Sequence, residues 1–118
     1  MSVELASILR ALHRSRVRVG LLLELETRQI AYIGQLERAL GVRSDLLKAA
    51  LHGRPPAYSV EGALIVLGLV REIRTRRGTA YAITSLGERV ARFARAEASE
   101  AQRGRRRLIT EFARVRGL

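Results

Sequence analysis

The sequence contains no cysteine and no tryptophan, and aromatic residues make up only 4% of it. Without cysteine, the chain cannot form disulfides, zinc ribbons or a catalytic thiol. Hydrophobic residues nevertheless reach 47%, which is typical of an ordered protein. The core must therefore be built from aliphatic side chains, which favours packed helices over an aromatic-rich β sandwich.

Long hydrophobic runs are also missing. The longest apolar run, residues 62–70, is far shorter than the roughly 20 residues that a helix needs to span a bilayer. The N-terminal residues lack the basic and then apolar layout of a signal peptide. We therefore expect a cytoplasmic protein with no membrane partner.

The sequence has few residues suited to catalysis or metal binding. His13 and His52 are the only histidines; they lie far apart and have no adjacent carboxylate pair. No phosphate-binding loop, dinucleotide fingerprint or nucleophile motif is present. We expect no enzymatic activity, no metal and no cofactor, and no site for a small-molecule effector can be recognised.

Positive charge is the strongest feature of the composition. Twenty-two basic residues against eleven acidic ones give a net charge of +11, and Lys48 is the only lysine. Such an excess in a folded domain points to a polyanionic partner, through electrostatic steering and counterion release. A high net charge also makes a protein soluble, so the positions of the arginines, more than their number, indicate the partner.

Apolar residues at helical spacing predict helices over residues 3–13, 16–27, 33–40, 44–52 and 59–67. In the second helix Leu21, Leu22 and Leu25 face inward, and Arg16, Arg18 and Glu24 are expected to face outward. Ser15 either breaks the first two helices or lies within one long helix, and a break is favoured. Ser44 is expected to cap the helix over 44–52 and Ser59 the helix over 59–67. Gly41 is expected to end the helix over 33–40, and Gly68 the helix over 59–67. Residues 53–59 hold both prolines and predict a loop.

After Gly68 the pattern changes from helix to strand. Residues 69–75 and 79–84 are β-prone and are joined by the basic turn of residues 76–78, which predicts a hairpin. Ser85 and Glu88 have the spacing of a capping box and announce a final helix. Gly104 and the arginines at 105–107 are expected to interrupt this helix.

This order of elements is that of a winged helix-turn-helix, a mainly α fold with a small β-hairpin wing. Its centre is the two-helix unit over residues 36–51. There Ala39 is small where two helices are expected to cross, Gly41 allows a positive φ in the turn, and Val42 fills the core.

The chain resembles winged-helix regulators of the MarR and ArsR kind, and more closely a group of small archaeal winged-helix regulators. The resemblance covers about residues 15–95 and is carried by SRVR at 15–18, LERALGV at 36–42, GLVR at 68–71 and YAITSLG at 81–87. It implies a DNA-binding transcriptional regulator. In such proteins GLV follows the second helix of the motif almost directly, whereas here about ten extra residues intervene. The recognition helix is either 44–52 or 59–67, and the near absence of charge in 59–67 favours 44–52.

A recognition helix presents its N-terminal residues to the major groove, and a hairpin tip can follow the phosphate backbone or enter the minor groove. Ser44 can donate to a phosphate while it caps the helix, whereas Asp45 either repels DNA or serves only the helix N-terminus. The candidate DNA-binding residues are Arg43, Ser44, Lys48, His52, Arg54, Arg71, Arg74, Thr75, Arg76 and Arg77.

Residues 1–84 are expected to form the winged helix-turn-helix domain with its N-terminal helix, and residues 85–118 a C-terminal helical extension. The apolar stripe of this extension is most simply covered by a second subunit, which favours a homodimer; the alternative is that it folds back on its own domain. The candidate dimer residues are Leu86, Val90, Phe93, Ala94, Ala101, Leu108 and Phe112. Arg103 and the arginines at 105–107 either add phosphate contacts or are simply solvated.

Double-stranded DNA is the expected partner, and association with the nucleoid follows from it. An architectural or chromatin-associated protein that binds any duplex through charge is the main alternative. A winged helix serving protein contacts in the transcription or translation machinery is another, which the arginine-rich hairpin disfavours. RNA is disfavoured because no stacking aromatics line a basic surface.

Overall fold

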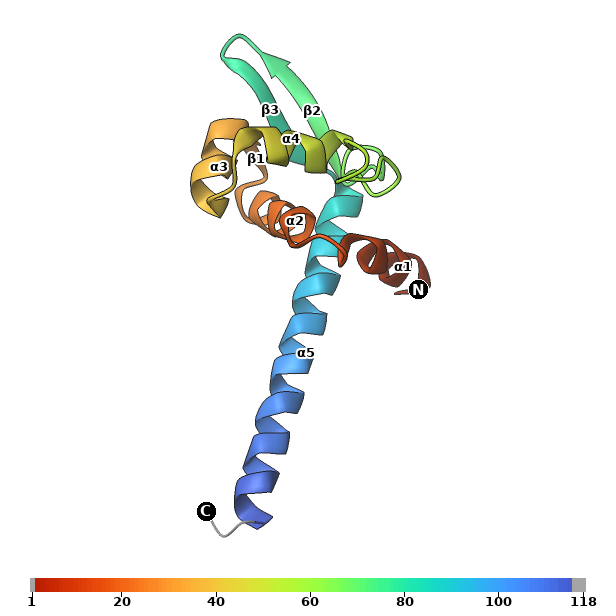
Figure 1. Cartoon of the computed structure of the whole chain (residues 1–118), viewed down its shortest axis with the longest axis vertical. Coiled ribbons are helices and arrows are strands. Elements are labelled where there is room, and N and C mark those ends of the chain that lie inside the picture. The colour runs from red at the N-terminus through yellow and green to blue at the C-terminus, as the bar shows by residue number, and fades with distance from the viewer. Residues whose placement is uncertain (1, 116–118) are drawn as a thin grey trace.

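A computed structural model describes the backbone of residues 2–115 and the side chains of residues 4–111. A head of short elements carries one long helix that projects from it, and the molecule measures 63 × 32 × 28 Å (Figure 1). In chain order the elements are α1 (Ser2–Leu12), α2 (Arg16–Arg28), β1 (Ile30–Tyr32), α3 (Ile33–Leu40), α4 (Ser44–His52), β2 (Val70–Thr75), β3 (Gly78–Ile83) and α5 (Ser85–Val115). The predicted fold class, mainly α with a β-hairpin wing, is confirmed.

The predicted ends of the early helices agree with the structure. The Ser15 Oγ accepts a hydrogen bond from the Arg18 N–H at 3.2 Å, and this cap separates α1 from α2. Gly41 ends α3 with a φ of 66°, which glycine adopts without strain. Ala39, however, is exposed, so it does not mark a helix crossing; Gly20 of α2 is the position that faces Leu40 closely.

Two capping predictions are each wrong by one residue. Ser44 is the first residue of α4, and its N–H donates to the carboxylate of Glu37 at 2.9 Å. Helix α5 is capped by Thr84, whose Oγ1 accepts from the Gly87 N–H at 3.0 Å. In both places an oxygen lying close to the helix start replaces the serine that the sequence pattern indicated.

The sheet has three antiparallel strands in the order β1-β3-β2. The predicted hairpin forms β2 and β3, with Val70 opposite Ile83 and Thr75 opposite Gly78. Strand β1 pairs Ile30 with Ala82 on the other side of β3. The sequence did not reveal β1 because three residues are too few to show an alternating pattern.

The helix predicted over residues 59–67 is wrong. This segment forms turns: the Ile65 N–H donates to the Leu51 carbonyl at 3.0 Å and so bonds to α4 instead of to its own preceding turn. Ala63 and Leu64 are fully buried, which explains the apolar spacing. The alternative that placed the recognition helix in this segment is therefore also wrong.

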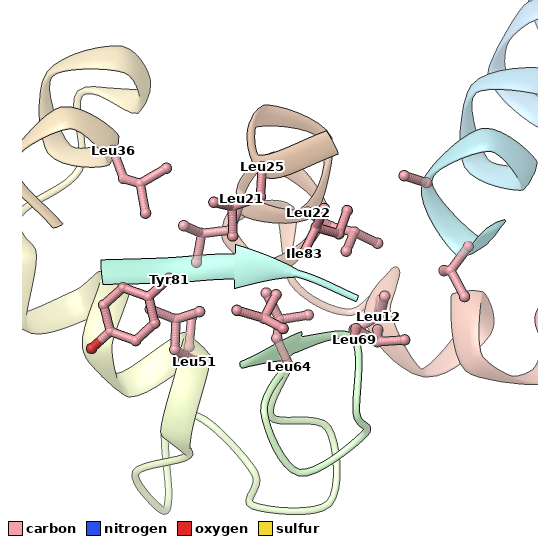
Figure 2. Packing of buried hydrophobic residues seen from close by; sticks show 14 of the residues in the cluster. Leu12, Leu21, Leu22, Leu25, Leu36, Leu51, Leu64, Leu69, Tyr81 and Ile83 are labelled. Carbon is pink, nitrogen blue, oxygen red and sulfur yellow. The ribbon is translucent and has the colours of Figure 1, made fainter. Parts of the chain in front are cut away.

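The core is organised around α2. Leu21 and Leu25 are fully buried and Leu22 is 1% exposed, and these side chains meet Leu36 from α3 and Leu51 from α4 (Figure 2). Burying one such leucine contributes about 1.5–3 kcal/mol relative to leaving it exposed. Helix α2 thus fixes the positions of α3 and α4, and it also contacts α5.

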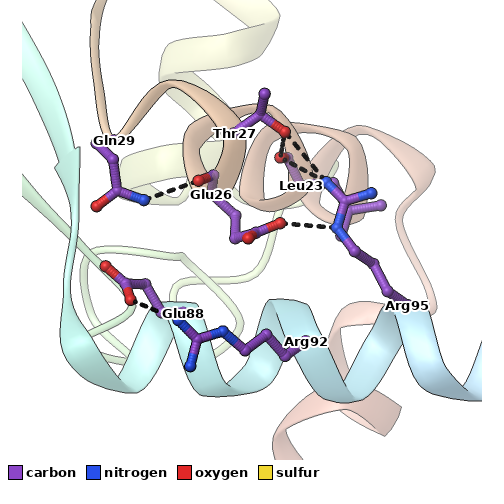
Figure 3. Close-up of polar contacts among 7 residues, drawn as sticks. All are labelled: Leu23, Glu26, Thr27, Gln29, Glu88, Arg92 and Arg95. Carbon is purple, nitrogen blue, oxygen red and sulfur yellow. Dashed lines mark hydrogen bonds and ion pairs between the residues drawn. The ribbon is translucent and has the colours of Figure 1, made fainter.

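Helix α5 begins inside this core and leaves it at Arg95. The Arg95 Nε donates to Glu26 at 2.7 Å, and its terminal nitrogen donates to Leu23 O and Thr27 Oγ1, both at 3.2 Å (Figure 3). Beyond Arg95 every side chain described is exposed. None of the helices within residues 2–115 is both long and apolar enough to cross a membrane.

The predicted interruption of this helix at Gly104 and residues 105–107 is wrong, since α5 is continuous from Ser85 to Val115. A Cβ placed on Gly104 would have nothing within 4 Å of it, so no neighbouring element forces the helix to break there. Arginine is also a good helix former.

The candidate dimer residues separate into two groups. Val90 is fully buried and Ala94 is 7% exposed within the chain itself, so the prediction that a second subunit covers them is wrong. Leu86 and Phe93 pack against the same core while staying partly exposed. Ala101 and Leu108 lie on the exposed part of α5, with Leu108 68% exposed. The Phe112 side chain lies outside the described residues.

Two glycines of α5 should respond oppositely to alanine. A Cβ at Gly87 would overlap the Leu69 carbonyl oxygen, because α5 crosses the start of β2 there. We expect Gly87→Ala to lower the free energy of unfolding by about 1–3 kcal/mol. Gly104→Ala, where a Cβ meets nothing, should cause no loss, since alanine favours a helix by up to about 1 kcal/mol. Urea unfolding compares the two, and equal midpoints would contradict the close crossing.

Candidate nucleic-acid interface

The exposed side of α4 borders a shallow groove of about 340 Å³. Leu47, Ala50 and Leu51 turn the opposite side of the helix into the core, where each is fully buried. Ala49 is 7% exposed and lines the groove. The groove is lined by Ser44, Asp45, Lys48, Ala49, His52, Gly53 and Arg54. Four of the candidate DNA-binding residues are therefore brought together.

The tip of the β2–β3 hairpin is a turn of Arg76 and Arg77. Thr75 shapes this turn: its Oγ1 donates to the Gly78 carbonyl at 2.8 Å and accepts from the Arg77 N–H at 3.2 Å. A further contact of 3.2 Å joins Thr75 Oγ1 to the hydroxyl of Tyr32 at the start of α3. Thr75 is thus engaged in building the turn, while both arginines of the tip point into solvent.

The end of α4 is joined to the wing by polar contacts. The His52 Nε2 lies 3.1 Å from a carboxylate oxygen of Glu72 in β2 and 3.4 Å from the Tyr81 hydroxyl in β3. Burial, together with the nearby Glu72, raises the pKa of Tyr81. The Glu72 carboxylate also lies 3.8 Å from the Arg74 Nε. These contacts therefore join the C-terminal end of α4 to strands β2 and β3 of the wing.

Most of the candidate cations are not neutralised by the chain. Arg43 lies 3.5 Å from Asp45 and Arg74 lies near Glu72, but their side chains are 77% and 89% exposed. Among the side chains of residues 4–111, the other candidates make no ion pair with a carboxylate; these are Lys48, Arg54, Arg71, Arg76 and Arg77. The surface consequently keeps a positive field available to an anion.

Arg71, like Thr75, lies on a different face of β2 from Arg74, the other candidate on that strand. Successive residues of a strand point to opposite faces, so Arg71 lies on the other face of the hairpin from Glu72 and Arg74. Since Glu72 faces α4, the side of the hairpin that carries Arg74 is the side that continues the α4 surface. In Figure 1 the hairpin points away from α5, at the opposite end of the molecule.

Arg18 is the site-related residue that sequence reasoning placed wrongly. It was expected to face outward, but its side chain is only 4% exposed. The Nε donates to the Ala50 carbonyl in α4 at 3.0 Å, and a terminal nitrogen donates to the Ser59 carbonyl at 2.6 Å. Burial lowers its pKa from the ordinary value, and Tyr58 partly offsets that effect. The signal was present, because 18, 21, 22 and 25 share the spacing of one buried helix face.

Among solved structures, the chain is similar to the adhesin competence repressor AdcR from Streptococcus pyogenes. The TM-score is 0.59 at 16% sequence identity, and the match covers 82% of this chain. The chain spans 66% of that protein's length, slightly less than two thirds. This likeness supports the winged-helix fold described above.

Curated protein sequences give no significant match to the chain. The family model described as EarA-like does match, over residues 8–94. That stretch contains α2, α3, α4, the wing and the part of α5 that packs against the core. The match covers well over half of the sequence, and the chain belongs to the EarA-like family.

Proposed function

We propose that this protein is a transcriptional regulator that binds double-stranded DNA through α4 and the wing. The observation that carries the proposal is that the α4 groove and the wing are joined through His52 and Glu72 and that both present unpaired cations. Lys48, Arg54, Arg76 and Arg77 make no ion pair with a carboxylate among the described side chains. Membership of the winged-helix regulators of the MarR and ArsR kind, and of their small archaeal type, is part of the same proposal. Its place of action would be the nucleoid.

In this proposal α4 enters the major groove, which is wide enough to admit a helix. Arg43, Ser44 and Lys48 lie on the first turns of the helix and read base edges or nearby phosphates, while His52 lies further along, at its end. The wing then follows the phosphate backbone, with Arg74, Arg76 and Arg77 supplying charge. Arg71 lies on the opposite face of the hairpin and contributes through its field more than through contact.

We further propose that the protein acts as a homodimer joined through the projecting part of α5, within the extension of residues 85–118. An isolated helix is only marginally stable in water, and a helix in a protein owes most of its stability to packing against other elements. Residues 95–111 have only exposed side chains, and Leu108 and Ile109 are each 68% exposed. A second copy covering this part of α5 would remove that exposure, and dimers of such proteins read two half-sites about one duplex turn apart.

The wing gives the first prediction. Replacing Arg76 and Arg77 with alanine should weaken binding to every duplex and reduce the slope of log K against log salt by about 2, since two phosphate contacts are lost. Fluorescence anisotropy across a salt series measures both. Arg10→Ala with Arg14→Ala is the control, because it removes the same charge from exposed residues near α1, far from the wing in Figure 1. Equal effects of the two pairs would remove the wing from the interface.

The recognition helix gives the second prediction. Arg43→Ala and Lys48→Ala should each change the preferred sequence, with a loss of about 1–3 kcal/mol in discrimination for a residue that reads a base. In vitro selection from a random duplex library measures the preference. An unaltered preference would argue against α4 as the reader. A wild-type protein that selects no sequence, and that random DNA displaces fully, would instead support an architectural role.

The dimer gives the third prediction. Leu108→Glu should raise the dissociation constant of the homodimer at least about tenfold, because a charge would enter an apolar contact. Sedimentation equilibrium measures the association. Thr110→Glu is the matched control, since Thr110 is an exposed residue of the same helix. A wild-type protein that stays monomeric at all concentrations would overturn the proposed dimer.

A further inference from the structure

The segment that follows α4 is an ordered hairpin instead of a simple loop. Arg54 and Tyr58 pair as in a two-stranded bridge, with backbone hydrogen bonds of 2.8 and 2.9 Å between them. Residues 55–57 form the turn, and their side chains are exposed. We name residues 54–58 the arm. Because Gly53 and Arg54 line the same groove as Ser44 and Lys48, the arm extends the exposed surface of α4.

The arm is attached to the core through one buried guanidinium. Arg18 donates to the Ser59 carbonyl at 2.6 Å and to the Ser59 Oγ at 3.3 Å, immediately after the arm. Its guanidinium carbon also lies 5.3 Å from the centre of the Tyr58 ring, within the range of a cation–π contact. The third donor, Nε, bonds to the Ala50 carbonyl in α4 at 3.0 Å. One side chain of α2 therefore fixes the recognition helix and the arm together.

The surrounding backbone is shaped to accommodate this guanidinium. A Cβ at Gly62 would lie 2.6 Å from the Arg18 Nη1, so this position has no room for a side chain. The planar fork of arginine reaches two carbonyls and a hydroxyl at once, which the single ammonium of lysine cannot reproduce. No buried side-chain polar atom within the described part of the chain lacks a hydrogen-bond partner. Arg18 is thus fully engaged inside the chain and is not available to DNA.

We propose that the arm is a third DNA-contacting element, which places Arg54 against a phosphate beside α4, and that Arg18 is the positioning residue for it. The inference rests on the proposed function, because it needs α4 to lie in the major groove. Arg54 is exposed and makes no ion pair with a described carboxylate. Its backbone is held by the arm, and the arm is held by Arg18, so the position of the Arg54 charge relative to α4 depends on a residue that never touches the duplex.

A double-mutant cycle tests this coupling. The probes are a duplex selected in vitro by the unchanged protein and a random duplex of equal length, both in fluorescence anisotropy at fixed salt. Arg54→Ala alone should weaken binding about tenfold, the loss of one charge-assisted hydrogen bond to phosphate. In an Arg18→Met background the arm is released, so adding Arg54→Ala should change binding by less than about twofold.

Arg16→Met is the matched control. Arg16 is exposed on the same helix, so its replacement removes the same charge without touching the arm. Arg54→Ala should keep its tenfold effect in that background. If the effects of the Arg18 and Arg54 substitutions on the binding free energy are additive, the two residues act independently and the positioning role is overturned. A general loss of stability would not depend on whether Arg54 is present.

Gly62→Ala keeps the experiment decisive if the Arg18→Met chain does not fold. It leaves every charge in place and displaces the guanidinium, so it should abolish the effect of Arg54→Ala in the same way. Amide hydrogen exchange of residues 54–62 without DNA should speed up in both variants, and unchanged exchange would show that Arg18 does not secure the arm. Failure of the unchanged protein to bind any duplex would end both proposals, whereas additivity in a protein that binds would end this one alone.

Discussion

The burial of one face of α2 among the other elements is the constraint on which they depend. This helix contacts α1, α3, α4 and α5 as well as strands β1 and β3. Leu21, Leu22 and Leu25 supply most of the apolar surface, and Arg18 supplies the polar contacts on the same face. Helix α4 and the projecting helix α5 both pack against α2, so this one helix relates the positions of the two.

Apolar burial does not by itself fix directions, because the hydrophobic effect depends on area and has no preferred orientation. In this molecule polar contacts do that work at the boundaries between elements. Glu37 accepts from the first N–H of α4, His52 meets Glu72 between α4 and the wing, and Arg95 fastens α5 to the last turns of α2. Each contact joins residues from different elements, so together they set the relative orientation of helices that packing alone would leave freer.

The sequence predicted much of this fold, because helices and hairpins are coded by local spacing. The bounds of α3 and α4, the break at Ser15 and the hairpin around residues 76–78 all followed from patterns within a few residues. What failed depended on distant partners. Residues 59–67 have helical spacing, yet Ile65 bonds to Leu51 instead, and Val90 looked like an interface residue because nothing local shows that the chain's own core covers it. The candidate DNA-binding residues came from position in a motif, and only the structure shows that the face of the hairpin carrying Arg74 is the one that meets α4.

The continuity of α5 gives the molecule the geometry of a lever. The helix runs without a break from the close crossing at Gly87 to its far end at Val115, a length of about 42 Å at 1.5 Å per residue. A tilt of about 10° at the crossing would move the far end by roughly 7 Å, by the same rise per residue. In a homodimer joined through the distal part of α5, small rearrangements near Leu69 would produce large changes in the distance between the two winged-helix heads. The stiffness of a single uninterrupted helix would then determine which spacings on a duplex both heads can reach at once.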